Sequence, residues 1–308
     1  MKKVGMMSMV LVVMLILGLS AGCGRQPQQP PAPAAPAGPY PLTVLDDAGR
    51  QVEITAAPQR IVSLLPSLTE TLFALGLGER VVGVTNFCNY PAEVQAKEKV
   101  GGLFDLNAEK ILALQPDIVI AGQMKGAQEV LNTLENAGVT VIVFDPATMN
   151  DVGRVIQAVA ELAGVKEKGE ALAGEISTGR EAMAAQVGAI AAEQKPSVFL
   201  LLDTEQIFTV GDGEYMSEMI VEAGGINAAS GQGEGWLQLS EEKLFALDPD
   251  IIIATFPMRE QLLTRPGWQK LQAIKTGRVY DVDGDLVSRP GPRVVLGLQE
   301  LNRIFYRP

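Results

Sequence analysis

The chain has 308 residues, of which 47% are hydrophobic, and it carries a formal charge of −11 with no histidine. This length is enough for one large domain or for two lobes of ordinary size. The acidic balance argues against a nucleic-acid partner. Without histidine, the Ser-His-Asp and Cys-His catalytic arrangements, histidine-based zinc sites and the commonest axial ligand of haem are all excluded.

The first 23 residues have the layout of a bacterial lipoprotein signal peptide. Lys2 and Lys3 precede an uncharged apolar stretch at residues 9–19, and small residues then lead to Cys23. The apolar stretch is short for a membrane span. We therefore expect an exported chain that is anchored through lipid on Cys23 to the outer face of the cytoplasmic membrane, or to the periplasmic side of an envelope membrane. An uncleaved membrane anchor is the alternative.

Residues 24–41 are rich in proline, alanine and glutamine and show no apolar periodicity. Such a composition favours an extended tether over a packed structure. The chain has two cysteines, Cys23 and Cys88. If Cys23 is lipidated, Cys88 has no partner for an internal disulfide, and we expect it to serve as a small packing residue rather than a metal ligand.

From residue 42 onward, short apolar strands alternate with helical stretches, which predicts an α/β fold built on mostly parallel sheets. Asp46–Gly49 predicts a hairpin turn, and Ser67 and Glu70 have the spacing of a capping box at the start of a helix. The remaining predicted strands lie at residues 60–64, 81–85, 117–121, 139–144, 197–202, 250–254 and 278–282. The remaining predicted helices start near Asn107 and Pro292 or lie at 127–137 and 215–223.

A long segment at residues 166–195 is rich in alanine, glutamate and lysine, and predicts one continuous helix after a break at Gly164. We expect this helix to join an N-terminal lobe at 42–165 to a C-terminal lobe at 196–308. Three glycines weaken the helical pattern by about 1 kcal/mol each: Gly169, Gly174 and Gly179.

An internal repeat supports two related lobes. The segment Leu106–Ile120 recurs as Leu239–Ile253, an offset of 133 residues (239 minus 106), with nine of fifteen positions identical. Each copy has the pattern of a helix cap, a short helix, Pro-Asp and a buried strand. Solenoid repeats have shorter periods, so two copies at this distance favour two similar lobes.

Several motifs occur in an order that resembles the periplasmic binding proteins for vitamin B12 and ferric siderophores. They are Arg60–Glu70, Val81–Pro91, the repeated segment and Arg289–Arg293. The resemblance implies two Rossmann-like lobes joined by a long rigid helix, a ligand cleft between them and only modest lobe motion. It also implies a binding protein without catalytic residues or cofactor. Its partner would be an ABC importer with a permease dimer and ATPase subunits, and we expect a monomer.

In that family, one exposed glutamate on each lobe docks into arginine pockets of the permease. The resemblance places these on Glu109 and Glu242, which occupy matched positions of the internal repeat. Each lies in a predicted first helical turn, where a carboxylate is favoured by the helix dipole. That compensation alone, worth about 0.3–1 kcal/mol, is the alternative explanation.

The resemblance also assigns ligand-contacting positions on both lobes. They comprise a loop after the first strand of the sheet, aromatic side chains and one basic residue: Pro66, Ser67, Phe87, Phe104 (or its neighbour Leu103), Phe208, Trp236 and Arg289. Phe208 as an ordinary core residue is the alternative. Aromatic faces suit the broad, largely apolar ring of a corrin, so we expect the ligand to be cobalamin or a related corrinoid.

Other ligands and other functions remain as alternatives. A ferric siderophore is the first, although an anionic complex would require more arginine. Haem comes next, with a tyrosine such as Tyr90 or Tyr215 as axial ligand. From different classes, the alternatives are an enzyme related to metal chelatases and a structural surface lipoprotein, because a fold alone does not determine function.

Overall fold

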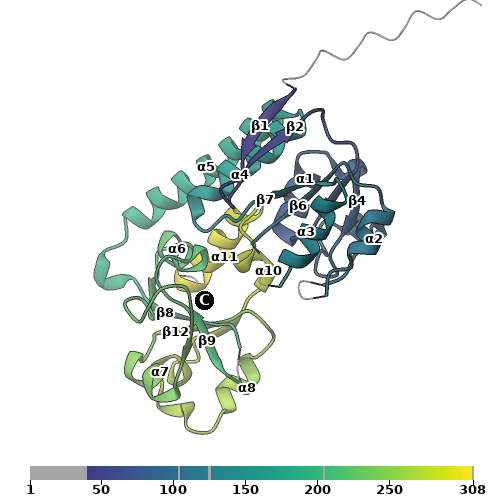
Figure 1. Cartoon of the computed structure of the whole chain (residues 1–308). Helices are drawn as coiled ribbons and strands as arrows, with labels where there is room; N and C mark the ends of the chain where they lie inside the picture. The colour runs from purple at the N-terminus through teal and green to yellow at the C-terminus, as the bar shows by residue number, and fades with distance from the viewer. Residues whose placement is uncertain (1–39, 103–104, 124–125, 204, 307–308) are drawn as a thin grey trace, which may run out of the picture. The chain divides into compact units, whose positions relative to one another are not determined.

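The computed structural model describes residues 40–102, 105–123, 126–203 and 205–306. Within them, two sets of parallel strands with flanking helices are joined by the helix α5 (Lys166–Gly188), which confirms the predicted two-lobed α/β fold (Figure 1). In this part of the chain, no helix combines the length and apolar character needed to cross a membrane. The predicted signal peptide with Cys23, residues 24–39 of the predicted tether and Phe104 lie outside the described residues.

The N-terminal part begins with the predicted hairpin, β1 (Leu42–Leu45) and β2 (Gln51–Ile54), which pair antiparallel. A five-stranded parallel sheet follows in the order β5-β4-β3-β6-β7. Its strands are β3 (Ile61–Ser63), β4 (Val81–Val84), β5 (Glu98–Lys99), β6 (Ile118–Ala121) and β7 (Thr140–Val143). The helices are α1 (Pro66–Ala74), α2 (Ala108–Ala113), α3 (Gln128–Asn136) and α4 (Met149–Leu162).

The C-terminal part contains a four-stranded parallel sheet in the order β10-β8-β12-β13 and a separate antiparallel pair, β9 and β11. The strands are β8 (Ser197–Leu201), β9 (Ile207–Val210), β10 (Ile226–Asn227), β11 (Trp236–Leu239), β12 (Ile251–Ala254) and β13 (Val279–Asp281). The helices are α6 (Tyr215–Glu222), α7 (Glu241–Leu247), α8 (Arg259–Thr264), α9 (Gln272–Lys275), α10 (Gly284–Ser288) and α11 (Val294–Tyr306). Short 3-10 turns lie at Gly78–Arg80, Ala92–Ala96, Ala192–Gln194 and Trp268–Lys270.

The internal repeat extends to backbone conformation and hydrogen bonding. Gln115 and Asp248, which are 133 residues apart (248 minus 115), are non-glycine residues with positive φ of 48° and 39°. Two residues further on, the carboxylate of Asp117 accepts backbone N–H bonds from the residues leading into β3, and that of Asp250 does the same at the start of β8. The two sheets are therefore built from the same local unit.

The glycines of α5 allow neighbouring helices to approach closely. A Cβ at Gly169 would overlap Ala160 of α4, and a Cβ at Gly179 would lie 2.7 Å from a methyl group of Val295 in α11. The helix ends at Gly188, before the predicted boundary at residue 195, and a 3-10 turn leads on to β8. Gly169 and Gly179, which weaken the helical pattern of α5, are thus explained by the close packing of this helix against α4 and α11.

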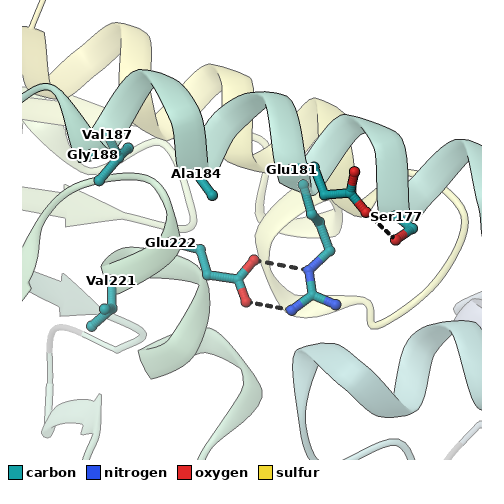
Figure 2. A pocket seen from close by; sticks show the side chains of 8 residues that line it. Ser177, Glu181, Ala184, Val187, Gly188, Val221 and Glu222 are labelled. Atoms are coloured by element: carbon teal, nitrogen blue, oxygen red, sulfur yellow. Dashed lines mark hydrogen bonds and ion pairs between the residues drawn. The ribbon is translucent and has the colours of Figure 1, made fainter.

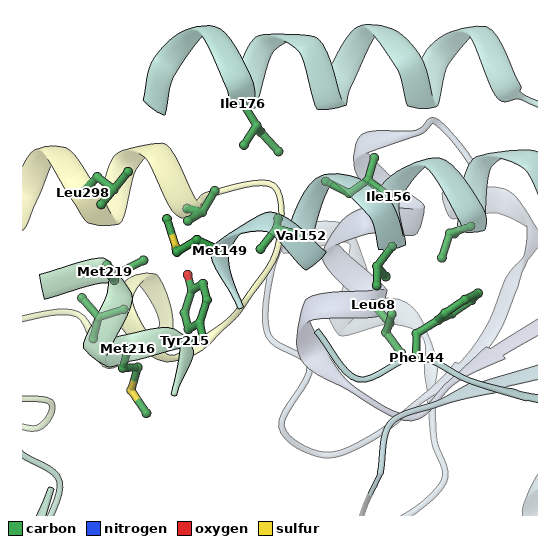
Figure 3. Close-up of a cluster of buried hydrophobic side chains, with 14 of the residues drawn as sticks. Leu68, Phe144, Met149, Val152, Ile156, Ile176, Tyr215, Met216, Met219 and Leu298 are labelled. Carbon is green, nitrogen blue, oxygen red and sulfur yellow. The ribbon is translucent and has the colours of Figure 1, made fainter. Parts of the chain in front are cut away.

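One apolar cluster continues from the first sheet into the second set of helices (Figure 3). It contains Leu68 and Phe144 beside the five-stranded sheet, Ile176 on α5, and Met219 and Leu298 on α6 and α11. Because separating the two lobes would expose this shared core to water, its burial favours limited lobe movement.

The predicted capping box at Ser67 and Glu70 is wrong. Helix α1 starts two residues earlier than that cap implies, at Pro66, with Leu65 as the N-cap and no side-chain cap. Proline suits the first helical turn because it lacks an N–H that would otherwise be unpaired. Ser67 and Glu70 are both buried, and Glu70 is engaged by two arginines of the other lobe.

Candidate ligand site and docking surface

Exposed aromatic side chains follow the carboxyl ends of strands in both lobes. Phe87 comes shortly after β4 and is 51% exposed, and Phe256 comes shortly after β12 and is 59% exposed. In doubly wound sheets, ligands bind beyond the carboxyl ends of the strands, near the point where the strand order reverses. β12 borders that point in its sheet, since β8 and β12 are neighbours. Phe256 is not among the predicted ligand residues, although it lies two residues after a predicted strand.

Trp236 and Phe208 share one face of the antiparallel pair β9 and β11. Phe208 pairs with Gln238, and Trp236 lies two residues before Gln238 on β11. Since side chains two residues apart on a strand point to the same side, both aromatic rings project from one face. Trp236 is 58% exposed and Phe208 is half-buried. This arrangement favours a surface role for Trp236. For Phe208, both interpretations stay open, a core residue and a ligand contact.

The other tryptophan has the opposite environment. Trp268 is fully buried and its Nε1–H donates to Oε1 of Glu241 at 2.9 Å. The chain has two tryptophans, so one is exposed on β11 and the other is buried in the C-terminal core.

Pro66, Ser67 and Arg289 lie where the two lobes meet. Ser67 is buried, and a Cβ at Gly291 would be 3.3 Å from its carbonyl oxygen, so the chain after α10 runs close to the start of α1. Arg289 donates to Glu70, to Asn89 and to the carbonyl of Phe87, and forms an ion pair with Asp285. Its guanidinium is therefore held by protein groups, and a direct ligand contact remains a prediction.

A cavity of about 460 Å³ lies elsewhere, between α5 and α6 (Figure 2). Its wall includes a bidentate ion pair in which Arg180 of α5 donates to both carboxylate oxygens of Glu222 of α6, at 2.5 and 2.9 Å. Ser177, Glu181, Ala184, Val187, Gly188 and Val221 complete the lining. None of the predicted ligand residues belongs to this cavity, which marks the contact between the linking helix and the C-terminal lobe.

Glu109 and Glu242 occupy equivalent and exposed positions. Each is the second residue of its helix, after the caps Asn107 and Ser240, whose side chains accept a backbone N–H bond three residues on. Hydrogen bonds from its own backbone N–H and from Ser240, together with the charge of Lys270, lower the pKa of Glu242. Both carboxylates therefore face solvent at the start of a helix.

The neighbouring Glu241 is not equivalent to Glu242. It accepts hydrogen bonds from Arg265 and from the indole of Trp268. The sequence has two adjacent glutamates at the start of α7, and the structure assigns the structural role to Glu241 and leaves Glu242 exposed.

The structure argues against one of the two tyrosines considered as haem ligands. Tyr215 is buried, its hydroxyl lies 3.4 Å from the carbonyl oxygen of Arg289, and burial strongly raises its pKa. An axial tyrosinate requires the opposite environment. Tyr90 is 47% exposed, with the guanidinium of Arg293 4.2 Å from its ring centre.

Cys88 packs as predicted. It is buried, and its Sγ lies 3.2 Å from Oγ1 of Thr69 and 3.3 Å from Oγ1 of Thr85. Among the residues that the structure describes, no group of three or more cysteine, aspartate or glutamate side chains is arranged to hold a metal ion.

Comparison with known proteins identifies the family. The sequence model of the periplasmic binding protein family matches residues 61–286. The chain belongs to this family. An uncharacterized ABC transporter substrate-binding lipoprotein of Bacillus subtilis is 35% identical over 311 residues, which span 99% of this chain and 98% of that protein.

Two solved structures extend the comparison. The periplasmic haem-binding protein of Roseiflexus sp. is 31% identical with a TM-score of 0.74, covering 80% of this chain and 98% of that one. The periplasmic vitamin B12-binding protein of Vibrio cholerae is 26% identical with a TM-score of 0.72, covering 81% and 97%. The chain is therefore a substrate-binding protein of an ABC importer, which implies permease and ATPase partners, and it is not an enzyme.

Proposed function

We propose that this substrate-binding protein captures cobalamin or a related corrinoid between its lobes and delivers it to the permease of an ABC importer. The observation that carries the proposal is a set of exposed aromatic rings: Phe87 and Phe256 beyond the carboxyl ends of β4 and β12, and Trp236 on β11. Phe87 and Phe256 follow the carboxyl ends of parallel strands, where ligands bind in such sheets, and flat aromatic faces suit a corrin ring. A relative of similar fold is named for vitamin B12 binding.

The charge distribution bears on the choice among metal complexes. Arg289 and Arg293 are both engaged by the carboxylate of Glu70. An anionic ferric siderophore would have to compete with that carboxylate for them. Haem would need an axial ligand, for which Tyr90 is the exposed tyrosine near this region. Each of these ligands is a second candidate, and the name of the haem-binding relative supports haem.

The ligand and its location can be tested together by fluorescence. The soluble chain starting at residue 42 is titrated with cyanocobalamin, whose corrin absorbs where tryptophan emits. We expect saturable quenching dominated by Trp236. The variants are compared by calorimetry, because substitution of Trp236 removes the fluorophore. Trp236→Phe keeps an aromatic ring and retains binding, whereas Trp236→Ala and Phe256→Ala weaken it. Leu45→Ala, a change at an exposed apolar residue of the hairpin (66% exposed), is the control and leaves binding unchanged. Equal affinity of all variants would contradict this site.

We also propose that Glu109 and Glu242 dock the two lobes onto the permease. Two exposed carboxylates on separate lobes are able to engage two guanidinium groups bidentately, which sets orientation as well as affinity. The test is complex formation with the purified permease and ATPase subunits. Glu109→Gln with Glu242→Gln should abolish it, while Glu129→Gln, an exposed glutamate in the first turn of α3, should not. The control separates docking from helix-dipole compensation.

Export and lipid attachment at Cys23 are proposed on the sequence alone. Growth of the producing cells with a labelled fatty acid should label the protein, and Cys23→Ser should remove the label. A Cys23→Ser protein that remains labelled would refute lipidation at this residue.

A further inference from the structure

The loop that carries Phe87 is hydrogen-bonded to the opposite lobe. This loop, residues 86–91, is called the Phe87 loop below. Nη2 of Arg289 donates to the carbonyl oxygen of Phe87 at 3.2 Å, and Nη1 donates to Oδ1 of Asn89 at 2.8 Å. The amide of Asn89 in turn donates to Asp285 at 2.8 Å. Asp285 of α10 and Arg289, the residue after this helix, therefore bind the Phe87 loop on the other lobe through hydrogen bonds.

The arginines that hold this loop are themselves anchored by Glu70. Its carboxylate accepts three hydrogen bonds, one from Arg289 at 2.8 Å and two from Arg293 at 2.7 Å each. The side chain of Glu70 is 2% exposed, and those of Arg289 and Arg293 are 11% and 14% exposed. Arg293 also stacks over the ring of Tyr90 in the same loop. Hydrogen bonds between ionised groups in a buried setting are the strong ones.

We propose that Glu70 is a positioning residue of the ligand site. Through Arg289 and Arg293 it clamps the Phe87 loop to the C-terminal lobe, so the aromatic surface offered to the ligand depends on the spacing of the lobes. The inference rests on the proposed role of Phe87 in ligand binding. Its consequence is that spreading of the lobes by the importer breaks the bonds to Phe87 and Asn89 and frees the loop.

A different ion pair, between the linking helix α5 and helix α6 of the C-terminal lobe, provides an internal comparison. Arg180 donates to both carboxylate oxygens of Glu222 and to the carbonyl of Met149. None of these groups belongs to the Phe87 loop. Breaking this ion pair weakens the junction of the lobes but leaves the clamp intact, so Glu222→Gln is the matched control for Glu70→Gln.

The loop contains its own probe. Cys88 lies between Phe87 and Asn89, is 1% exposed, and is the single thiol of a chain that starts at residue 42. Its rate of reaction with dithionitrobenzoate, measured well below the unfolding temperature and without ligand, reports how often the loop opens. We expect Glu70→Gln and Arg289→Gln to raise this rate roughly tenfold or more, the factor that corresponds to about 1.4 kcal/mol. Asn89→Ala, which removes one link at the loop side, should raise it as well.

The control separates release of the Phe87 loop from a general weakening of the contact between α5 and the C-terminal lobe. Glu222→Gln should react at the wild-type rate. A Glu70→Gln protein that reacts as slowly as wild type would overturn the clamp. So would thiol rates that rise equally in Glu70→Gln and Glu222→Gln. Wild-type protein that binds no metal complex, with thiol rates as expected, would refute the proposed ligand and leave the clamp standing. If cyanocobalamin binds, Glu70→Gln should weaken it about tenfold and Glu222→Gln should not.

Discussion

Replacement of Glu70 by glutamine should destabilise the protein by about 3 kcal/mol. Removing one partner of a buried ion pair costs about 3–5 kcal/mol, because the remaining charge stays buried without compensation. Glutamine keeps the shape and one acceptor oxygen. Arg289 also retains its ion pair with Asp285 at 2.7 Å, which places the loss at the lower end of that range. Arg293 loses its anionic partner and keeps the contact with Tyr90.

Thermal unfolding of the soluble chain, followed by circular dichroism, measures this effect. For a protein of this size, 1 kcal/mol shifts the unfolding temperature by roughly 2–4 °C, so a decrease of about 6 °C or more is expected. Glu300→Gln is the control. Glu300 pairs with Arg303 on the surface of α11, where such pairs contribute about 0.3–0.5 kcal/mol. If Glu70→Gln and Glu300→Gln unfold within about 1 °C of each other, the reasoning about buried charge is refuted.

Two further predictions concern α5 and the hairpin. Gly174→Ala should stabilise the protein by about 1 kcal/mol, because a Cβ at that position meets no atom within 4 Å. Gly179→Ala should destabilise the protein, because its Cβ would clash with Val295. Equal unfolding temperatures of the two variants would contradict this expectation. Burial raises the pKa of Asp46, but hydrogen bonds from the side chain and backbone of Arg50 and from the backbone of residue 143 outweigh it and lower that pKa overall. A lowered folded-state pKa gives stability that is present at neutral pH and lost as the pH falls through it. Asp46→Asn should therefore be less stable at neutral pH and show a flatter acid-side loss of stability in unfolding curves at several pH values.

The strands of both sheets were predictable where the sequence had apolar runs buried on two faces. β3, β4, β6, β7, β8 and β12 all fall within the predicted ranges, and so does β13, of which only Val279 is fully buried. The repeat identified α2 and α7 and their caps, because matched Pro-Asp positions follow both helices. Asp46–Gly49 gave the hairpin through local turn chemistry, which needs no tertiary contact.

The errors arose where distant contacts decide the outcome. Ser67 and Glu70 have the spacing of a capping box. Glu70 instead binds Arg289 and Arg293, which lie 219 and 223 residues further along the chain. The strands β9 and β11 are short and lie beside glycine-rich turns, so their pairing has little local signal. Phe256 follows a buried strand, but its exposure depends on the loop that places it and not on its neighbours in sequence.

The proposed ligand is tested most directly by calorimetric titration of the soluble chain with cyanocobalamin, a ferric hydroxamate siderophore and hemin, each under identical conditions. We expect saturable one-to-one binding, strongest for cyanocobalamin. Tighter binding of the siderophore or of hemin would replace the proposed ligand within the same transport role. Failure of all three to bind would contradict the claim that this protein captures a large metal-containing ligand.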